Sequence, residues 1–101
     1  MNSLIESHRN ELNALFDEHF VDKAYLFGSA LGTEFTSDSD LDFLIDFTDG
    51  LNPEVKGELW WSLLDSLRSM FKREIDLVIS TSLKNPYFIK EVNKNKLLIY
   101  G

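Results

Sequence analysis

The segment Asp40-Leu41-Asp42-Phe43-Leu44-Ile45-Asp46-Phe47 decides the fold, because its polar and apolar residues alternate with the period of a β-strand. Successive side chains of a strand point to opposite faces, so Asp40, Asp42 and Asp46 share one face with Leu44. The other face carries Leu41, Phe43, Ile45 and Phe47, all of which are apolar. The segment therefore predicts a strand that gives one face to the core and presents carboxylates on the other.

Helices and short strands alternate around this segment. Apolar spacing and Asn-Pro start signals predict helices over residues 3–20, 53–71 and 86–93. Short apolar runs predict further strands over residues 23–28, 74–80 and 96–100, and residues 29–32 could form a brief helix. This order predicts the α/β (α+β) class, with a small mixed sheet and helices packed mainly on one face. A length of 101 residues predicts a single domain spanning residues 1–101.

Composition and charge exclude several functions. Cysteine is absent, so the chain has no disulfides, no thiolate zinc site and no cysteine nucleophile. Ten Lys and Arg residues against 17 Asp and Glu residues give a formal charge of −7, which opposes binding of free nucleic acid. The apolar runs are far shorter than the roughly 20 residues that span a bilayer, and the N-terminus does not resemble a secretion signal. We expect a cytoplasmic protein with no membrane contact.

The carboxylates of Asp40 and Asp42 are candidate metal ligands. On one strand face they stand roughly 6.5–7 Å apart and repel each other, so folding gains nothing from the pair unless a cation uses it. Carboxylate oxygens suit Mg²⁺ or Mn²⁺. An isolated pair of this kind is more often a solvated acidic turn. An EF-hand is excluded because Phe43 and Asp49 stand where that loop needs glycine and glutamate, and no P-loop tripeptide occurs.

A turn at Gly28-Ser29 raises the metal hypothesis above the acidic-turn alternative. It follows a predicted buried strand and precedes Asp40 by twelve residues. Glycine permits close approach of the backbone to a ligand, and amides at a helix start bind phosphate oxygens. Asp76, on the predicted strand over residues 74–80, supplies a third carboxylate. A phosphate cradle with three carboxylates is what metal-assisted nucleotidyl transfer requires.

The stretch from Leu26-Phe27-Gly28-Ser29 to Asp40-Leu41-Asp42 resembles the Gly-Ser…Asp-x-Asp signature of the polymerase-β-like nucleotidyltransferase superfamily. The small size and the ending from Asn85-Pro86 to Tyr100-Gly101 resemble its minimal nucleotidyltransferase (MNT) branch. The resemblance implies that Asp40 and Asp42 are the metal pair, with Asp38 outside the site. It places the third acid on the next core strand, at Asp76, with Glu74 as the fallback.

The resemblance also implies a partner and a reaction. Members of this branch are typically encoded beside a small helical protein of the HEPN type, which they inhibit as antitoxins. Some do so by transferring AMP from ATP to a tyrosine of the toxin. One departure concerns phosphate binding: many members read Gly-Ser-x-Ala-Arg-Gly, whereas this chain has Ala30-Leu31-Gly32 after Gly28-Ser29, with no arginine. A cationic triphosphate contact is therefore missing or supplied from elsewhere. One of the lysines near the C-terminus could supply it, but such a group more often forms a solvated face; these are Lys84, Lys90, Lys94 and Lys96.

These observations lead to one main hypothesis and one alternative. The main hypothesis is a metal-dependent nucleotidyltransferase that moves a nucleoside monophosphate, AMP from ATP, onto a hydroxyl of a partner protein. Asp40 and Asp42 bind Mg²⁺ or Mn²⁺, Asp76 holds the catalytic metal and helps deprotonate the acceptor, and Gly28 with Ser29 holds the phosphates. Acceptor binding comes from the partner or from a second copy of the chain. The alternative is a non-catalytic module that neutralises a partner by covering it.

Overall fold

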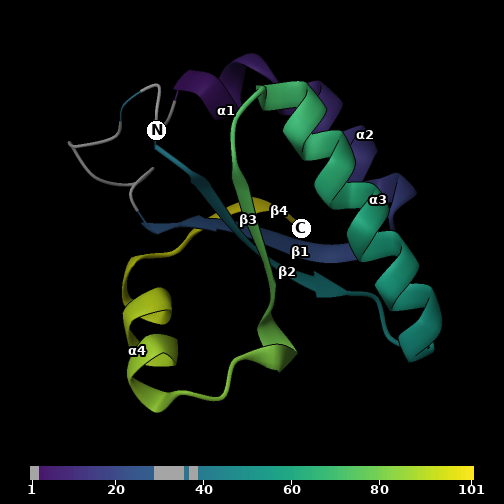
Figure 1. Cartoon of the computed structure of the whole chain (residues 1–101), viewed down its shortest axis with the longest axis vertical. Helices are drawn as coiled ribbons and strands as arrows, with labels where there is room; N and C mark the ends of the chain where they lie inside the picture. Colours follow the sequence, from purple (N-terminus) through teal and green to yellow (C-terminus); the bar gives the residue numbers. More distant parts are fainter. Residues whose placement is uncertain (1–2, 29–35, 37–38) are drawn as a thin grey trace.

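The computed structural model describes residues 3–28, 36 and 39–101, and its helices and strands alternate along the chain (Figure 1). The brief helix expected over residues 29–32 lies outside the described residues. The elements in chain order are α1 (Ser3–Ser7), α2 (Arg9–Glu18), β1 (Val21–Phe27), β2 (Leu41–Phe47), α3 (Pro53–Phe71), β3 (Ile75–Ile79), the 3₁₀ turn η2 (Ser80–Ser82), α4 (Pro86–Asn95) and β4 (Leu97–Tyr100).

The four strands form one mixed sheet in the order β3-β2-β1-β4 (Figure 1). β1 pairs antiparallel with β2 and with β4, whereas β2 and β3 are parallel. Parallel neighbours need a long crossover, and the 19 residues of α3 provide it. The mixed sheet expected from the sequence is confirmed.

The larger core lies between one face of the sheet and the helices α1, α2 and α3. Side chains from all three helices and all four strands meet there, and several have no exposed surface at all. Phe16 of α2, for example, lies edge-on to Phe43 of β2 with ring centroids 6.4 Å apart. The fully or almost fully buried side chains of this core include Ile5, Leu12, Phe16, Leu26, Leu41, Phe43, Ile45, Leu63 and Leu67.

The opposite face of the sheet is partly covered by α4. Val92 of α4 packs with Phe27 of β1 and Leu44 of β2 in a second, smaller cluster. Phe88 of α4 stands edge-on to Phe27, with 6.1 Å between ring centroids. Three helices thus cover one face and one helix covers part of the other. Leu44 is buried on the face that also bears the carboxylates, because α4 covers that part of the face.

The N-terminal helix expected over residues 3–20 is in fact two helices that meet at His8. His8 has φ −115° and ψ 15°, outside helical values, and its amide bonds back only three residues to Ile5. The Ser7 hydroxyl donates to the Leu4 carbonyl at 2.9 Å, and His8 Nδ1 lies 3.0 Å from the same oxygen. These side chains occupy a carbonyl that a continuous helix would use, which is a known way for polar residues to interrupt one.

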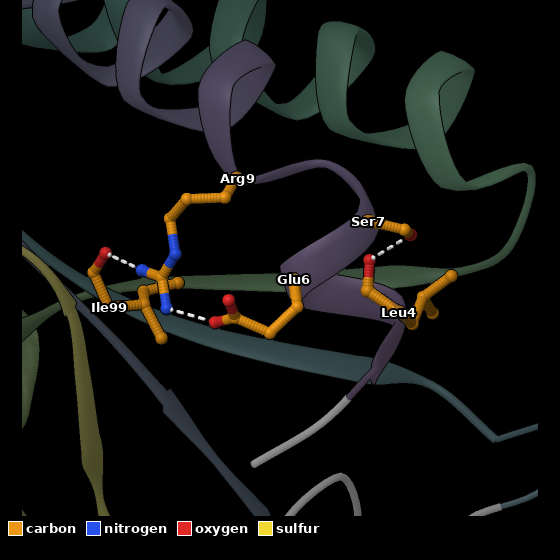
Figure 2. A network of polar contacts seen from close by, with 5 residues as sticks. All are labelled: Leu4, Glu6, Ser7, Arg9 and Ile99. Atoms are coloured by element: carbon orange, nitrogen blue, oxygen red, sulfur yellow. Dashed lines mark hydrogen bonds and ion pairs between the residues drawn. The ribbon is translucent and has the colours of Figure 1, made fainter.

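Arg9 fixes α1 against the sheet from the first turn of α2. Its guanidinium contacts Glu6 of α1 at 2.5 Å and donates to the Ile99 carbonyl of β4 (Figure 2). The contact joins residues that are 90 positions apart. The break at His8 therefore lets α1 turn toward β4, while Arg9 holds the two together.

The two later helices begin as the Asn-Pro pairs predict. Asn52 accepts a hydrogen bond from the Val55 amide at 2.8 Å, and Asn85 accepts from the Tyr87 amide at 2.9 Å. α3 ends at Lys72, whose left-handed backbone has φ 53°. Within the described part of the chain, each helix is too short or too polar to cross a membrane.

The adjacent tryptophans of α3 are in different environments, as their helical spacing requires. Trp60 is partly buried, and its indole N–H donates to the Leu77 carbonyl of β3 at 2.9 Å. Trp61 is 60% exposed. The expectation that one of the two is exposed is confirmed, and Trp60 links α3 to the edge strand of the sheet.

Replacing the Asn52 cap is expected to weaken α3. In Asn52→Ala the Val55 amide loses its acceptor, so the free energy of unfolding should fall by about 1 kcal/mol. Asn52→Asp keeps the acceptor oxygen and adds a negative charge at the helix start, so it should match or exceed the wild type. Urea denaturation followed by circular dichroism measures both. Equal stability of the alanine and aspartate variants would contradict the capping role.

Candidate active site

Asp42 and Asp76 lie side by side on neighbouring parallel strands. The register of β2 and β3 pairs them directly, between the pairs Leu41 with Ile75 and Phe43 with Leu77. Paired residues share a face, and adjacent strands stand about 4.8 Å apart. Asp42 is half-buried and Asp76 is exposed. Like charges placed directly opposite each other weaken a sheet, so the pairing points to a use other than stability.

Gly28 lies against the Asp42 carboxylate. It follows the last residue of β1, Phe27, which pairs with Asp42 across the antiparallel register. Its backbone has φ +72°, a left-handed conformation that favours glycine. A methyl group added at Gly28 would lie 3.1 Å from Asp42 Cγ and would overlap Oδ2. Glycine is therefore required both by the turn and by the space that the Asp42 carboxylate occupies.

Asp40 is exposed and lies one residue before β2. The Leu41 amide that follows it donates to the Glu74 carbonyl at 3.1 Å, which aligns the start of β2 with the start of β3. Within the described ranges, no group of three or more histidine, aspartate or glutamate side chains is gathered closely enough to hold a metal ion. The structure thus brings Asp42 beside Asp76 and leaves the three-carboxylate metal set, with Asp40 as a member, as a prediction.

The remaining candidate site residues from the sequence are Ser29, Asp38 and Glu74. Ser29 and Asp38 lie outside the described residues. Glu74, the fallback for the third acid, is exposed and lies 3.7 Å from Arg68 of α3 in a surface ion pair. Its side chain is directed toward α3 in this ion pair, so the register favours Asp76 over Glu74 as the neighbour of Asp42.

Sequence reasoning missed two polar residues, one near the site and one at the far end of β2. The Ser80 hydroxyl of η2 donates a hydrogen bond to the carboxylate of Asp46, which lies on the same face of β2 as Asp42. Asp46 therefore has a hydrogen-bonding role at the far end of the strand. Arg73 donates from Nη1 to the carbonyls of Thr36 and Ser39, at 3.1 and 3.0 Å. The only sequence signal for Arg73 was a basic residue three positions before Asp76.

The described donors fit a hard divalent cation. Asp42 and Asp76 offer only carboxylate oxygens, the ligand type that Mg²⁺ and Mn²⁺ prefer over nitrogen and sulfur. Gly28 has no side chain, so the Asp42 carboxylate lies directly against the backbone at the end of β1. The arrangement suits a bound cation that is shared with phosphate oxygens.

Sequence comparison matches most of the chain to known proteins. A family model described as "Polymerase beta, Nucleotidyltransferase" matches residues 10–101. Two provisionally named protein adenylyltransferases of Methanocaldococcus jannaschii are similar. One is 29% identical over 100 residues, covering 99% of this chain and 96% of the relative. The other is 32% identical over 92 residues, covering 91% and 88%.

Structural comparison finds the same fold in toxin–antitoxin complexes. A chain of a toxin–antitoxin complex with AMP-PNP superposes with a TM-score of 0.68 and 25% identity, covering 92% of this chain and 73% of that one. A second match is a complex from Shewanella oneidensis of a tri-AMPylated HEPN toxin with an MNT antitoxin. Its TM-score is 0.66 at 22% identity, with 95% of this chain and 71% of that one covered. This second likeness bears on the fold alone.

Gly28→Ala is expected to destabilise the protein through the Asp42 carboxylate. The left-handed backbone and the overlap with Oδ2 should together lower the free energy of unfolding by about 2–4 kcal/mol. In an Asp42→Ala background the overlap is gone, and the cost of Gly28→Ala should fall by about 1–2 kcal/mol. Urea denaturation of the four proteins in this cycle gives the coupling directly.

Gly57→Ala is the matched control for this cycle. Gly57 lies inside α3, and an added methyl would meet no atom within 4 Å. The control should therefore gain about 0.5–1 kcal/mol from its better helix propensity. If Gly28→Ala cost the same with and without the Asp42 carboxylate, the close approach described above would be wrong.

Proposed function

The chain belongs to the polymerase β nucleotidyltransferase family, as a minimal nucleotidyltransferase, and from this membership we propose that it transfers AMP from ATP to a hydroxyl of a partner protein. It is an enzyme of the nucleotidyltransferase kind, and a nucleotide is its substrate. The proposal adds the metal ion, adenine as the nucleobase, the acceptor hydroxyl and the residues that bind the substrate and carry out the transfer. It treats residues 1–101 as one catalytic domain.

The observation that carries the proposal is the register pairing of Asp42 with Asp76 beside Gly28. Two acids placed opposite each other weaken the sheet, and a glycine with a left-handed backbone lies directly against one of them. A site for a cation and a phosphate accounts for both features. A surface turn kept acidic for solubility requires neither.

We assign the metal to Asp42 and Asp76, with Asp40 as a further ligand from the residue before β2. Mg²⁺ or Mn²⁺ bound there would neutralise phosphate charge and polarise the reacting phosphoryl group. The carboxylates would hold the cation at the end of the sheet where β2 and β3 begin. Gly28 and Ser29 are proposed to bind phosphate oxygens through their backbone amides and the serine hydroxyl.

The proposed reaction forms one bond and breaks another at the α-phosphorus of ATP. The acceptor hydroxyl oxygen bonds to that phosphorus, the bond to the oxygen bridging the α- and β-phosphates breaks, and pyrophosphate leaves. The hydroxyl proton passes to Asp76 or to water. Asp76 suits this role because it is exposed, so an acceptor brought from outside the chain can reach it.

The acceptor is proposed to lie on a partner of the HEPN type. All the helices and strands of the described chain take part in the sheet and its two clusters, so a separate acceptor platform is best supplied by a second protein. The complex from Shewanella oneidensis joins an MNT antitoxin to an AMPylated HEPN toxin. Because members of the MNT branch are typically encoded beside a HEPN protein, membership of that branch supports a small helical protein as the acceptor for this chain.

Adenylyl transfer should depend on Asp42 and Asp76 when the protein is mixed with Mg-ATP and its HEPN-type partner. Intact mass spectrometry should show the partner gaining the mass of one AMP moiety or more. Asp42→Asn and Asp76→Asn should each slow the transfer by about 10²–10³-fold, because each removes a charge that stabilises the transition state. Asp65→Asn, an exposed acid of α3, is the matched control and should transfer at the wild-type rate.

The same mixture separates the enzyme from a non-catalytic binding module. A stable complex in which the partner's mass does not change would support the alternative, in which the chain neutralises its partner by covering it. In that case Asp42→Asn should leave the affinity of the complex unchanged. Equal loss of transfer in Asp65→Asn would also argue against the proposed site.

Mg-ATP should stabilise the chain against heat even without a partner. Ligand at 100 times its dissociation constant adds about 2.7 kcal/mol to the free energy of unfolding. The shift in melting temperature should be abolished in Asp42→Asn and retained in Asp65→Asn. Melting curves that stay unchanged at millimolar Mg-ATP would contradict a nucleotide site in the isolated chain.

A further inference from the structure

Arg73 connects two segments that are far apart in sequence and adjacent to the site. It stands between the end of α3 and the start of β3, three positions before Asp76. Its Nη1 donates to the Thr36 carbonyl at 3.1 Å and to the Ser39 carbonyl at 3.0 Å. Ser39 immediately precedes Asp40, so one guanidinium reaches the backbone that leads into the proposed ligands.

The two residues that Arg73 contacts, Thr36 and Ser39, are also hydrogen-bonded to each other. The Ser39 amide donates to the Thr36 carbonyl at 3.1 Å, and the Thr36 amide donates to the Ser39 hydroxyl at 3.0 Å. Glu74, the residue after Arg73, accepts a hydrogen bond at its backbone carbonyl from the Leu41 amide at 3.1 Å. Contacts from residues 73 and 74 therefore fix the backbone on both sides of Asp40.

We infer that Arg73 is a positioning residue for the adenylyl-transfer site, holding the backbone of residues 39–41 so that Asp40 and Asp42 face the ligand position beside Asp76. The inference rests on the proposed function. Hydrogen bonds from a charged donor are stronger than neutral ones, and a guanidinium has a planar array of donors that can serve two carbonyls at once.

The placement of Arg73 explains why this role falls to it and not to its neighbour Arg68. Arg68 lies on α3, and its guanidinium forms an exposed 3.7 Å ion pair with Glu74. Surface pairs of that kind contribute little. Arg73 instead donates to two backbone oxygens of the site segment, and its side chain is partly buried.

The test compares Arg73→Met, Arg73→Lys and the control Arg68→Met in the full chain. Arg73→Met keeps an unbranched, flexible stem but removes the charge and the donors. Mn²⁺ binding, measured by calorimetry without nucleotide or partner, should weaken by about 10–100-fold, as when groups that orient metal ligands are removed. Hydrogen exchange of peptides covering residues 39–42 in the metal-free protein should speed up, while exchange in β1 and β4 stays unchanged.

Arg73→Lys keeps the charge and can donate to one or both carbonyls, so it should recover most of the Mn²⁺ affinity and of the AMP transfer. Arg68→Met should match the wild type in every measurement. Arg73→Met binding Mn²⁺ and transferring AMP as well as Arg68→Met, even with a lower melting temperature, would overturn the positioning role. A wild type that neither binds Mn²⁺ nor transfers AMP would overturn the proposed function itself, whichever way hydrogen exchange responds.

Discussion

The parallel pairing of β2 with β3 is the constraint on which the site depends. It places Asp42 beside Asp76, and a slip of one residue would turn either carboxylate to the core face. The register is held from behind, because Leu41, Phe43 and Ile45 of β2 are fully buried against α1, α2 and α3. The hydrophobic core thus fixes the position of the acids on the opposite face, although it makes no contact with a ligand.

The carboxylate face is divided between chemistry and packing. Along β2, Asp42 lies at one end, Leu44 is buried by α4 in the middle, and Asp46 is held by Ser80 at the other end. α4 therefore covers the middle of a face that would otherwise expose apolar side chains. The end near Gly28 and Asp76 is where two acids paired across neighbouring strands lie beside a glycine. The fold confines the site to one end of one sheet face.

Much of the fold could be predicted from the spacing of apolar residues, because that spacing shows which face of a strand or helix is buried. The strand around Asp42, the limits of α3 and the Asn caps of α3 and α4 all follow from local patterns. The break at His8 did not, since it depends on side chains taking a backbone carbonyl and on Arg9 reaching β4. The second cluster around Val92 also did not, because the face to which α4 returns is set by tertiary packing.

The site was predictable in its residue types and not in its contacts. Gly28 and Asp42 are 14 positions apart in the sequence. The antiparallel register of β1 with β2 brings them together.

Arg73 shows the same difference more sharply, because its partners are the backbone carbonyls of Thr36 and Ser39, and a carbonyl has no signature in a sequence. A motif therefore identifies the groups that could meet a metal or a phosphate. The groups that hold them at a workable distance come from wherever the fold supplies a donor. The placement of the acids thus depends on backbone contacts from residues 73 and 74 as well as on the motif that names the acids.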